Sequence, residues 1–168
     1  TRTLTYRVAW LLDHGTDPWN ILLLTFTNKA AREMTERVRA LIPIDLSRLW
    51  SGTFHSIANR ILRQHADYLG YTPAFTIMDS DDRKSMIKSI VKALKLDEKS
   101  SRFPKPEVLS SLFSLADNEG AGIQETLENA YPYLSNHLDA ILDVHEQYVL
   151  RKQETNSMDF DDLLLKTL

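Results

Sequence analysis

The chain has 168 residues and a formal net charge of −3, and 43% of its residues are hydrophobic, which is enough for a folded core. Charged residues at 26% and only 5 glycines argue against a disordered chain. The absence of cysteine excludes a disulfide framework and a cysteine-based metal site. No apolar run approaches the roughly 20 residues of a membrane helix, so we expect no membrane partner and a cytoplasmic location.

The charge is unevenly distributed along the chain. Residues 1–65 contain 9 Lys/Arg and 5 Asp/Glu, whereas residues 66–168 contain 11 Lys/Arg and 18 Asp/Glu. A basic front and an acidic back indicate a polyanion contact confined to the front. Ordinary variation of the surface explains the same asymmetry equally well.

The front of the chain alternates between two kinds of pattern. Apolar residues recur at helical spacing in residues 3–12, and residues 21–24 form a short apolar run typical of a buried strand. A second helix is predicted from Asn28, which would be its N-cap, and a second strand within residues 48–53. This rhythm predicts an α/β sheet, with the three tryptophans in its core or at a domain interface.

After Thr53 the pattern becomes almost entirely helical. Helices are predicted for residues 54–69, 79–96, 104–116, 134–152 and 159–168, with a brief extended piece at 75–77. We therefore predict an α/β piece at residues 1–54, a helical domain at 55–157, and a return to the α/β piece at 158–168.

The junction between the first strand and the second helix gathers groups that could bind a nucleic acid. Unpaired N–H groups at a helix start favour anions, and the side chains of Thr25, Thr27, Asn28 and Lys29 add donors and a positive charge. Phe26 offers an aromatic face for stacking on a base. The alternative is structural: Asn28 caps the helix and Phe26 packs in the core.

A second strand-to-helix junction has a similar composition. In the segment Gly52–Ser56, glycine permits close approach of the backbone, and Thr53, His55 and Ser56 can donate to phosphate oxygens. A plain N-cap beside a buried aromatic residue accounts for the same five residues.

An acidic segment near the end has two interpretations. Asp159, Asp161 and Asp162 could bind a metal ion, but carboxylates beside a helix start also act as caps. We favour capping and packing.

Three segments together carry a resemblance to a known family. TFTNKAAREM at residues 25–34, GTFHS at 52–56 and MDFDDLLL at 158–165 are similar, in this order, to motifs of the UvrD/Rep/PcrA-type superfamily 1 DNA helicases. The resemblance implies part of a P-loop (RecA-like) α/β domain with a predominantly α-helical inserted subdomain beside the DNA duplex.

The resemblance also implies roles for individual residues. Phe26 would stack on a base, and Thr53 and His55 would hold the phosphate backbone. The full set of implied contacts with single-stranded DNA is Thr25, Phe26, Thr27, Asn28, Lys29, Thr53, Phe54 and His55.

The first residues resemble the end of the phosphate loop of the same family. Thr1 matches the threonine that binds Mg²⁺, and Arg2, the next residue, is expected to bind the nucleotide. ATP and Mg²⁺ are therefore the implied cofactors of the parent protein. The glycines and lysine of the loop, the acidic box and the arginine finger do not match residues of this chain. We therefore expect no complete catalytic set and no ATP hydrolysis by these 168 residues alone.

The implied parent protein is an ATP-dependent helicase that moves 3′ to 5′ on single-stranded DNA and acts at single/double-strand junctions, in DNA repair or replication. One alternative is an ATP-dependent nuclease–helicase subunit of the same superfamily. Another is a non-enzymatic helical interaction module, which the acidic back half would suit because a duplex-binding surface is expected to be basic.

Overall fold

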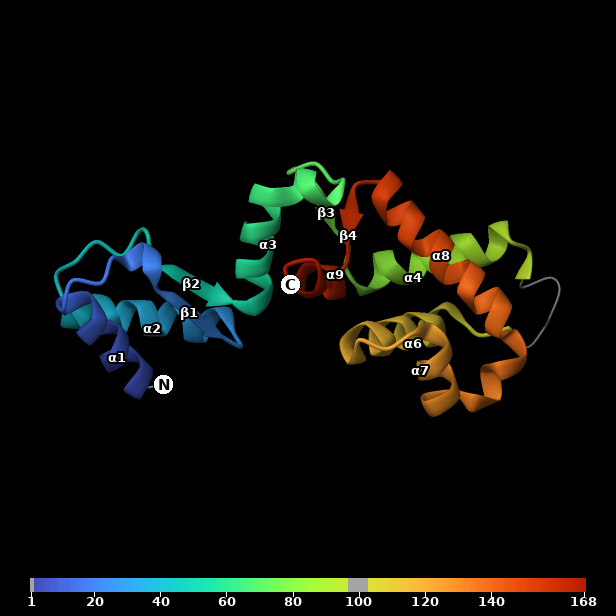
Figure 1. The fold of residues 1–168 in the computed structure, drawn as a ribbon, viewed down its shortest axis with the longest axis horizontal. Helices are drawn as coiled ribbons and strands as arrows, with labels where there is room; N and C mark the ends of the chain where they lie inside the picture. Colours follow the sequence, from blue (N-terminus) through green and yellow to red (C-terminus); the bar gives the residue numbers. More distant parts are fainter. Residues whose placement is uncertain (1, 97–102) are drawn as a thin grey trace. The chain divides into compact units, whose positions relative to one another are not determined.

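The protein is described here from a computed structural model, which covers residues 2–96 and 103–168. The chain forms two compact units, of which the first ends at Ile61 and the second begins at Leu62. The boundary falls within the helix α3 (Phe54–His65). Figure 1 labels the elements of both units.

Unit 1 is built around a parallel pair of short strands. Its elements before α3 are α1 (Arg2–Asp13), the 3-10 turn η1 (Pro18–Asn20), β1 (Leu22–Thr25), α2 (Asn28–Leu41) and β2 (Trp50–Thr53). The strands β1 and β2 pair in parallel, and α2 forms the connection between them. The predicted alternation of helix and strand is therefore present.

The core of unit 1 comes from one face of each helix. Val8 and Leu12 of α1 and Met34 and Val38 of α2 are buried together with Leu23 of β1. The helical spacing of these side chains is the pattern that identified both helices in the sequence.

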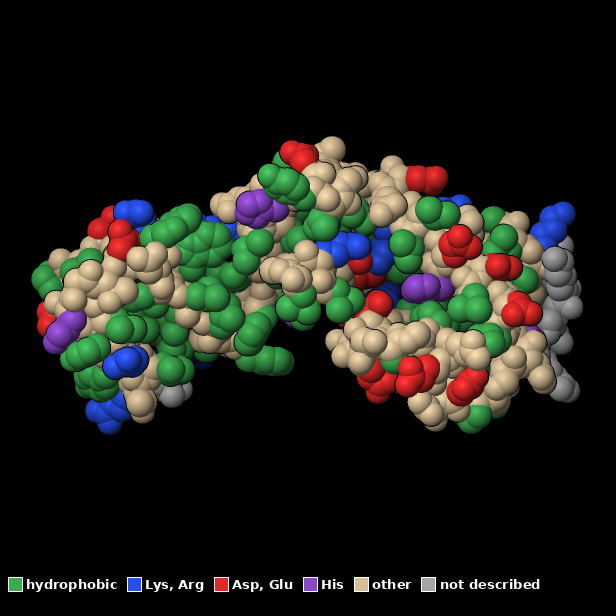
Figure 2. Space-filling view, viewed as in Figure 1, with side chains coloured by type: hydrophobic (Ala, Val, Ile, Leu, Met, Phe, Trp, Pro, Cys, Tyr) green, Lys and Arg blue, Asp and Glu red, His purple; other side chains and the backbone are tan. Residues whose placement is uncertain are grey.

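The opposite side of the sheet has an apolar groove of about 230 Å³, lined by Trp19, Leu22, Trp50, Ile57 and Ile61 together with their neighbours in η1. In Figure 2, green side chains gather over η1 and β2. A core position does not hold for Trp10 and Trp19 within this unit, and the alternative position at a domain interface stays a prediction.

Two of the three tryptophan side chains are about half exposed. Trp10 is 49% exposed and stacks on His14, and Trp19 is 47% exposed and meets Trp50 edge to face. The Trp10 ring lies at the surface because it is on the opposite face of α1 from Val8 and Leu12, which are buried in the core.

Unit 2 is mainly helical. After the end of α3 its described elements are η2 (Ala66–Leu69), β3 (Thr76–Ile77), α4 (Ser80–Ala93), α6 (Pro106–Glu119), α7 (Ile123–Ala130), η3 (Pro132–His137), α8 (Leu138–Glu154), β4 (Ser157–Met158) and α9 (Phe160–Leu165). The strands β3 and β4 pair in parallel although they lie some 80 residues apart in sequence. Arg63 donates hydrogen bonds to the carbonyl oxygens of Pro73 and Phe75, which holds the turn before β3.

The core of unit 2 joins four helices. Ile87 of α4, Phe113 of α6, Leu127 of α7 and Ile141 of α8 are all fully buried in one cluster. The helices predicted for residues 79–96, 104–116 and 134–152 correspond to α4, α6 and α8. The last begins later than predicted because the preceding residues, up to His137, form η3. None of the described helices is both long and apolar enough to cross a membrane.

The units do not coincide with the predicted domain limits. The first turns of α3 belong to unit 1, and residues 158–168 belong to unit 2. The predicted limits at residues 54 and 157, and the return of 158–168 to the α/β domain, concern a larger domain and stay predictions.

Candidate nucleic-acid interface

The two polar junctions lie at the same end of the sheet of unit 1. In the parallel register, Thr25 of β1 is the partner of Thr53 of β2, and each threonine is the last residue of its strand. The carboxyl ends of parallel strands meet at one edge. Two segments separated by more than 20 residues in sequence therefore emerge side by side.

The first junction is fixed by two threonine hydroxyl groups. Thr25 Oγ1 donates to the carbonyl oxygen of Thr27 at 3.0 Å, and Thr27 Oγ1 accepts from the backbone N–H of Ala30 at 3.1 Å. The N-cap of α2 is therefore Thr27, and the prediction of Asn28 as the cap is wrong. The backbone of Thr27 is extended, whereas Asn28 is the first helical residue.

This shift of the cap changes what Asn28 can do. Its exposed side-chain amide is not used to close the helix, and the same is true of the exposed ammonium group of Lys29. Both side chains therefore stand at the start of α2, where unpaired N–H groups and the helix dipole favour an anion.

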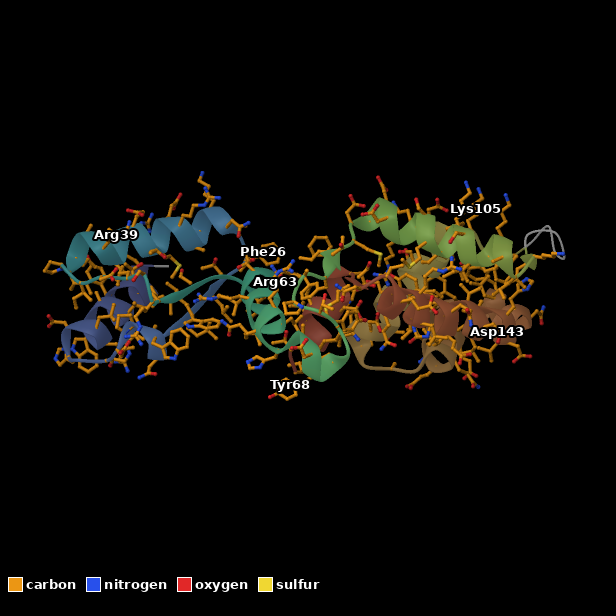
Figure 3. All side chains as sticks on the ribbon, turned by 90° about the horizontal axis from the view of Figure 1, so that it is seen from above. Phe26, Arg39, Arg63, Tyr68, Lys105 and Asp143 are labelled. Carbon is orange, nitrogen blue, oxygen red and sulfur yellow. The ribbon has the colours of Figure 1, made fainter. Side chains whose placement is uncertain are left out.

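Phe26 lies between these polar residues and is 94% exposed. The alternative in which it packs in the core is wrong within the described structure. Figure 3 labels its side chain. A fully exposed aromatic ring in a polar turn gains nothing from burial, so its contribution to the fold is small.

The second junction repeats the chemistry of the first. Thr53 Oγ1 accepts from the backbone N–H of Ser56 at 3.2 Å, and Ser56 Oγ donates to the carbonyl oxygen of Thr53 at 2.9 Å. Phe54 is 53% exposed and His55 is half-buried. A hydroxyl group has one donor and two acceptor sites, so the capping bonds of Thr27 and Thr53 leave their hydroxyl protons available to a ligand.

Gly52 allows the tight start of the second junction. A Cβ atom at this position would lie 2.4 Å from Ser56 Oγ and 3.4 Å from the side chain of Ile57. The glycine is needed for this close approach and not for an unusual backbone angle.

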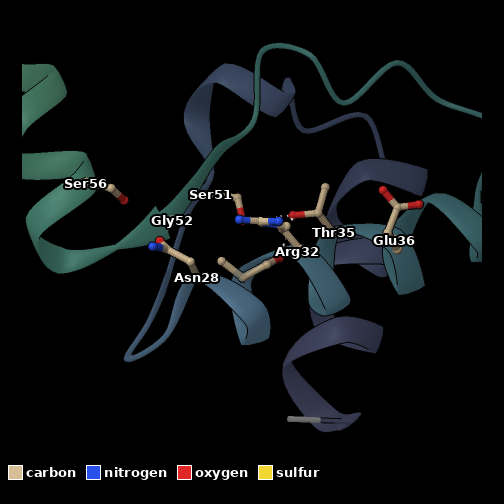
Figure 4. Close-up of a pocket in the computed structure, with 8 residues that line it drawn as sticks. Asn28, Arg32, Thr35, Glu36, Ser51, Gly52 and Ser56 are labelled. Carbon is tan, nitrogen blue, oxygen red and sulfur yellow. Dashed lines mark hydrogen bonds between the residues drawn. The ribbon is translucent and has the colours of Figure 1, made fainter.

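A polar pocket of about 300 Å³ opens beside these junctions and is shown in Figure 4. It is lined by Asn28, Ala31, Arg32, Thr35, Glu36, Ser51, Gly52 and Ser56. Thr35 Oγ1 and Ser51 Oγ lie 2.9 Å apart and hydrogen-bond across its floor. The pocket joins the first junction to the second through side chains of α2 and β2.

Arg32 is the cation of this pocket, and sequence reasoning missed it. Among the residues that the structure describes it forms no ion pair, whereas Arg37 and Arg39 of the same helix pair with Glu33 and Glu36. Its position four residues after Asn28, on the same helical face, was the signal that could have found it.

The residues assigned to ATP and Mg²⁺ are only partly described. Thr1 lies outside the described residues. Arg2 is exposed at the first turn of α1 and lines a pocket of about 480 Å³ with Tyr6, Arg37 and Leu41. Over residues 2–96 and 103–168, no cluster of three His, Asp or Glu side chains could hold a metal ion.

The acidic segment of unit 2 caps a helix, as favoured from the sequence. Asp159 is the N-cap of α9, and the side chains of Asp159 and Asp162 each accept from the other's backbone N–H at 2.9 and 3.0 Å. This reciprocal arrangement is a capping box.

The same carboxylates are neutralised by buried cations. Lys152 Nζ lies 3.0 Å from Asp159 Oδ2 and 2.6 Å from Asp162 Oδ2, and the buried Arg83 pairs with Asp161. Burial alone would raise the pKa of Asp159, but Lys152, Arg83 and the hydrogen bonds to the carboxylate outweigh it and hold this pKa at about 2. Asp159 is therefore an ionised structural residue.

Unit 1 is a parallel β–α–β unit with two hydroxyl-capped junctions at one sheet edge, and a helical unit follows it. This arrangement places the chain among the α/β proteins. The family model of the UvrD/REP helicase N-terminal domain matches residues 1–168, and the chain belongs to this family, for which a RecA-like fold is implied.

Named relatives agree with this family. The ATP-dependent DNA helicase PcrA of Staphylococcus aureus is 39% identical over 169 residues, and that of Staphylococcus epidermidis is 38% identical over the same length. The similarity covers all of this chain and 22% of each relative. The chain thus spans about a fifth of the length of the curated relatives that it matches.

Proposed function

We propose that this chain is part of an ATP-dependent DNA helicase that moves 3′ to 5′ on single-stranded DNA. In this proposal the edge of unit 1 is a stretch of the single-strand track. The observation that carries it is the fully exposed ring of Phe26 between two threonine-capped helix starts, Thr27 and Thr53.

The chemistry of this edge suits binding of a single strand of nucleic acid independently of its base sequence. Single strands are held by stacking of bases on aromatic rings and by donors to the phosphates. Phe26 supplies the ring. The amide of Asn28, the ammonium group of Lys29, and the hydroxyl protons of Thr27 and Thr53 supply the donors. Phe54 and His55 extend the surface along α3.

Thr25 has a different part in the proposal. Its hydroxyl group already donates to the carbonyl oxygen of Thr27, so it positions the turn that carries Phe26. Arg32 joins the proposed contacts because its guanidinium lines the pocket between the two junctions. An arginine can bind a phosphate through two parallel hydrogen bonds.

The remaining parts of the proposal come from the family. ATP and Mg²⁺ are the proposed cofactors, with Thr1 as a metal ligand and Arg2 near the nucleotide. Mg²⁺ would neutralise the charge that develops on the phosphates. Residues 55–157 would be the inserted helical subdomain at a single/double-strand junction, in a cytoplasmic protein. The relatives named as helicases favour this function over a nuclease–helicase subunit or an interaction module.

The test is to replace Phe26 by Ala in the full-length protein that carries this chain. Loss of one stacking contact should weaken single-strand affinity by about 1–3 kcal/mol. Fluorescence anisotropy with labelled oligonucleotides of several sequences measures it, and the loss should be the same for each sequence.

Tyr68→Ala is the matched control, because this aromatic side chain is 88% exposed but lies on η2 of unit 2. It should leave single-strand affinity unchanged, and Phe26→Trp should keep most of it. Unchanged affinity and unwinding in Phe26→Ala would remove the stacking role.

Thr53→Ala tests the phosphate contact at the second junction. It should weaken single-strand affinity by a similar factor for every oligonucleotide sequence, because phosphate contacts position the strand without reading bases. A loss restricted to some sequences would contradict a backbone contact at Thr53.

A further inference from the structure

A pocket of about 340 Å³ opens in unit 2 where the first turns of α4 and α9 meet one face of α6. Figure 1 shows α9 beside the start of α4. The side chains that matter for its chemistry are Asp79, Arg83, Ser110, Ser114, Phe160 and Asp161. Its volume lies at the lower end of the range for small-molecule sites, and none of these residues is among the proposed contacts with DNA or ATP.

The guanidinium group of Arg83 is satisfied on one side only. Its side chain is 9% exposed, and Nη1 donates to the carboxylate of Asp161. Nε and Nη2 are buried and have no hydrogen-bond partner among the described residues. A buried donor without an acceptor destabilises the fold, so these two nitrogens indicate an acceptor that unit 2 does not itself supply.

The two free nitrogens of Arg83 form one edge of the guanidinium group. The N–H bonds of such an edge run parallel, and this fork matches the two oxygen atoms of a carboxylate or of a phosphate. Both nitrogens are shielded from bulk water, so an acceptor would reach them through the pocket that Arg83 lines. The free edge therefore favours an oxyanion as the ligand.

Two serines of α6 add donors to the same pocket. Ser110 and Ser114 are half-buried and lie one helical turn apart. Ser114 Oγ accepts from Asn118 Nδ2 at 3.3 Å, which leaves its hydroxyl proton available. An oxyanion in the pocket can thus be held from two helices.

Asp79 restricts the charge of the ligand. This carboxylate is the N-cap of α4, and its Oδ1 accepts from the backbone N–H groups of Asp82 and Asp81 at 2.9 and 2.8 Å. These two bonds lower the pKa of Asp79, so it is ionised at neutral pH. Among the described residues Asp79 forms no ion pair, whereas Asp161 is paired with Arg83. A dianion such as phosphate is repelled more strongly by Asp79 than a carboxylate is, and a cationic group is attracted.

The spacing of the two charges sets the size of the ligand. The backbone N–H of Arg83 donates to the carbonyl oxygen of Asp79 at 3.0 Å, so the two residues are one helical turn apart. At a rise of about 1.5 Å per residue this separation is roughly 6 Å along the helix axis. Phe160 is half exposed and lines the same pocket, which suits a short hydrocarbon chain.

We propose that this pocket binds a small zwitterion of amino-acid size, with its carboxylate held by Arg83, Ser110 and Ser114 and its cationic group held by Asp79. The site lies within unit 2, so it stands or falls independently of the proposed function of the edge of unit 1. A bound ligand would link α4 to α6 and would raise the stability of unit 2 as its concentration increases.

The test titrates the 168-residue chain with three probes that share one carbon chain, namely 5-aminopentanoate, pentanoate and pentylamine. Calorimetry measures the affinities, and the NMR signal of the Arg83 Nε–H group, identified by its absence from Arg83→Lys, reports on the free edge. 5-Aminopentanoate should bind at least about tenfold more tightly than either other probe, because each of these lacks one charge-assisted contact. It should also shift the Arg83 signal. Inorganic phosphate is the fourth probe and should bind more weakly than 5-aminopentanoate.

Asp79→Asn separates the two ends of the ligand. Asparagine is also a good N-cap, so the variant should fold and should bind 5-aminopentanoate no better than pentanoate. Asp81→Asn is the matched control, because Asp81 is exposed at the same helix start but lies outside the described lining of the pocket. It should keep the preference for 5-aminopentanoate.

Arg83→Lys keeps a charge for Asp161 but removes the parallel N–H pair, so the affinity for both carboxylates should fall about tenfold or more. Ser110→Ala/Ser114→Ala leaves the buried ion pairs in place and should weaken both carboxylates if Arg83→Lys does not fold. Carboxylate binding that persists unchanged in the serine variant and in every folded Arg83 variant would place the ligand elsewhere.

The probes themselves decide the remaining alternatives. Equal affinities for 5-aminopentanoate and pentanoate would overturn the zwitterion, and phosphate binding tighter than both would overturn the carboxylate. If none of the four probes binds, water fills the free edge of Arg83 and the proposed site is refuted.

Discussion

At the scale of single residues, the ability of the edge of unit 1 to bind a ligand depends on two sets of polar groups. One set forms hydrogen bonds to the backbone at the two helix starts, and the other set is not used there. Thr25 is used inside the turn, and Thr27 and Thr53 each accept one backbone N–H. Asn28 is released from the capping role that its sequence position suggests. The groups available to a ligand are therefore those left over after the two helix starts have been satisfied.

Gly52→Ala tests the tight packing of the second junction. The new Cβ would lie 2.4 Å from Ser56 Oγ, so we expect the free energy of unfolding of unit 1 to fall by about 1–3 kcal/mol. Urea denaturation of the 168-residue chain measures this loss.

Removing the obstructing atom provides the control. In Gly52→Ala/Ser56→Ala the loss should be smaller than the sum of the two single losses, because the clash is with the removed hydroxyl group. Additive losses would show that Ser56 Oγ is not the obstacle and that the strand itself rejects a side chain at Gly52.

At the scale of elements, buried ion pairs link α4, α8 and α9 of unit 2. Lys152 of α8 faces Asp159 and Asp162 at the start of α9, and Tyr148 donates to Asp159 Oδ2 at 2.7 Å. Burial with Asp159 nearby raises the pKa of Tyr148. Asp117 of α6 lies near the same network, and burial raises its pKa to about 6.

The shifted pKa values of Asp159 and Asp117 predict opposite effects of pH on the free energy of unfolding of unit 2. The pKa of Asp159 is lowered to about 2, so its stabilisation is present above its ordinary pKa of 3.8 and is lost as pH falls towards 2. The pKa of Asp117 is raised to about 6, so its effect is most favourable below 3.8 and is lost as pH rises through 6. The free energy of unfolding should therefore rise from pH 2 to 4 and flatten or decline towards pH 6.

Single substitutions separate the two limbs of this profile. Asp117→Asn should remove the decline between pH 4 and 6, and Asp159→Asn should reduce the rise between pH 2 and 4, which is worth about 2 kcal/mol for a shift of this size. Urea denaturation at each pH gives the profile. If Asp117→Asn leaves the profile unchanged, Asp117 does not titrate near pH 6 in the folded protein.

At the scale of the whole molecule, the described residues form two separate hydrophobic clusters. One contains Val8, Met34 and Val38 of unit 1, and the other contains Phe113 and Leu127 of unit 2. Each described cluster draws its residues from a single unit. A defect in one core should therefore leave the other core intact.

Leu127→Ala tests this independence. The side chain is fully buried in unit 2, so its truncation should cost about 2–5 kcal/mol and lower the melting temperature of unit 2 alone. Val38→Ala should do the same for unit 1. Differential scanning calorimetry should show two transitions that move separately, whereas one shared transition displaced by both changes would contradict two independent cores.

The sequence by itself determined the local elements and the family. Helical spacing of apolar residues and the short run at 21–24 are local patterns, and α1, α2, α4, α6 and α8 follow them. The short helix α7 was missed because its pattern has only two strongly apolar residues, Ile123 and Leu127. The three motifs were enough for the family because together they span most of the chain.

The tertiary structure alone decided which of these segments meet and which groups are left at the surface. Three contacts join residues far apart in sequence. They are the register that pairs Thr25 with Thr53, the pairing of β3 with β4, and the buried ion pair between Arg83 and Asp161. The exposure of Phe26 was also decided by the tertiary structure, because the residue type alone does not show whether a phenylalanine is buried or exposed. Such contacts arise from the packing of elements against one another, which a pattern along the chain does not record.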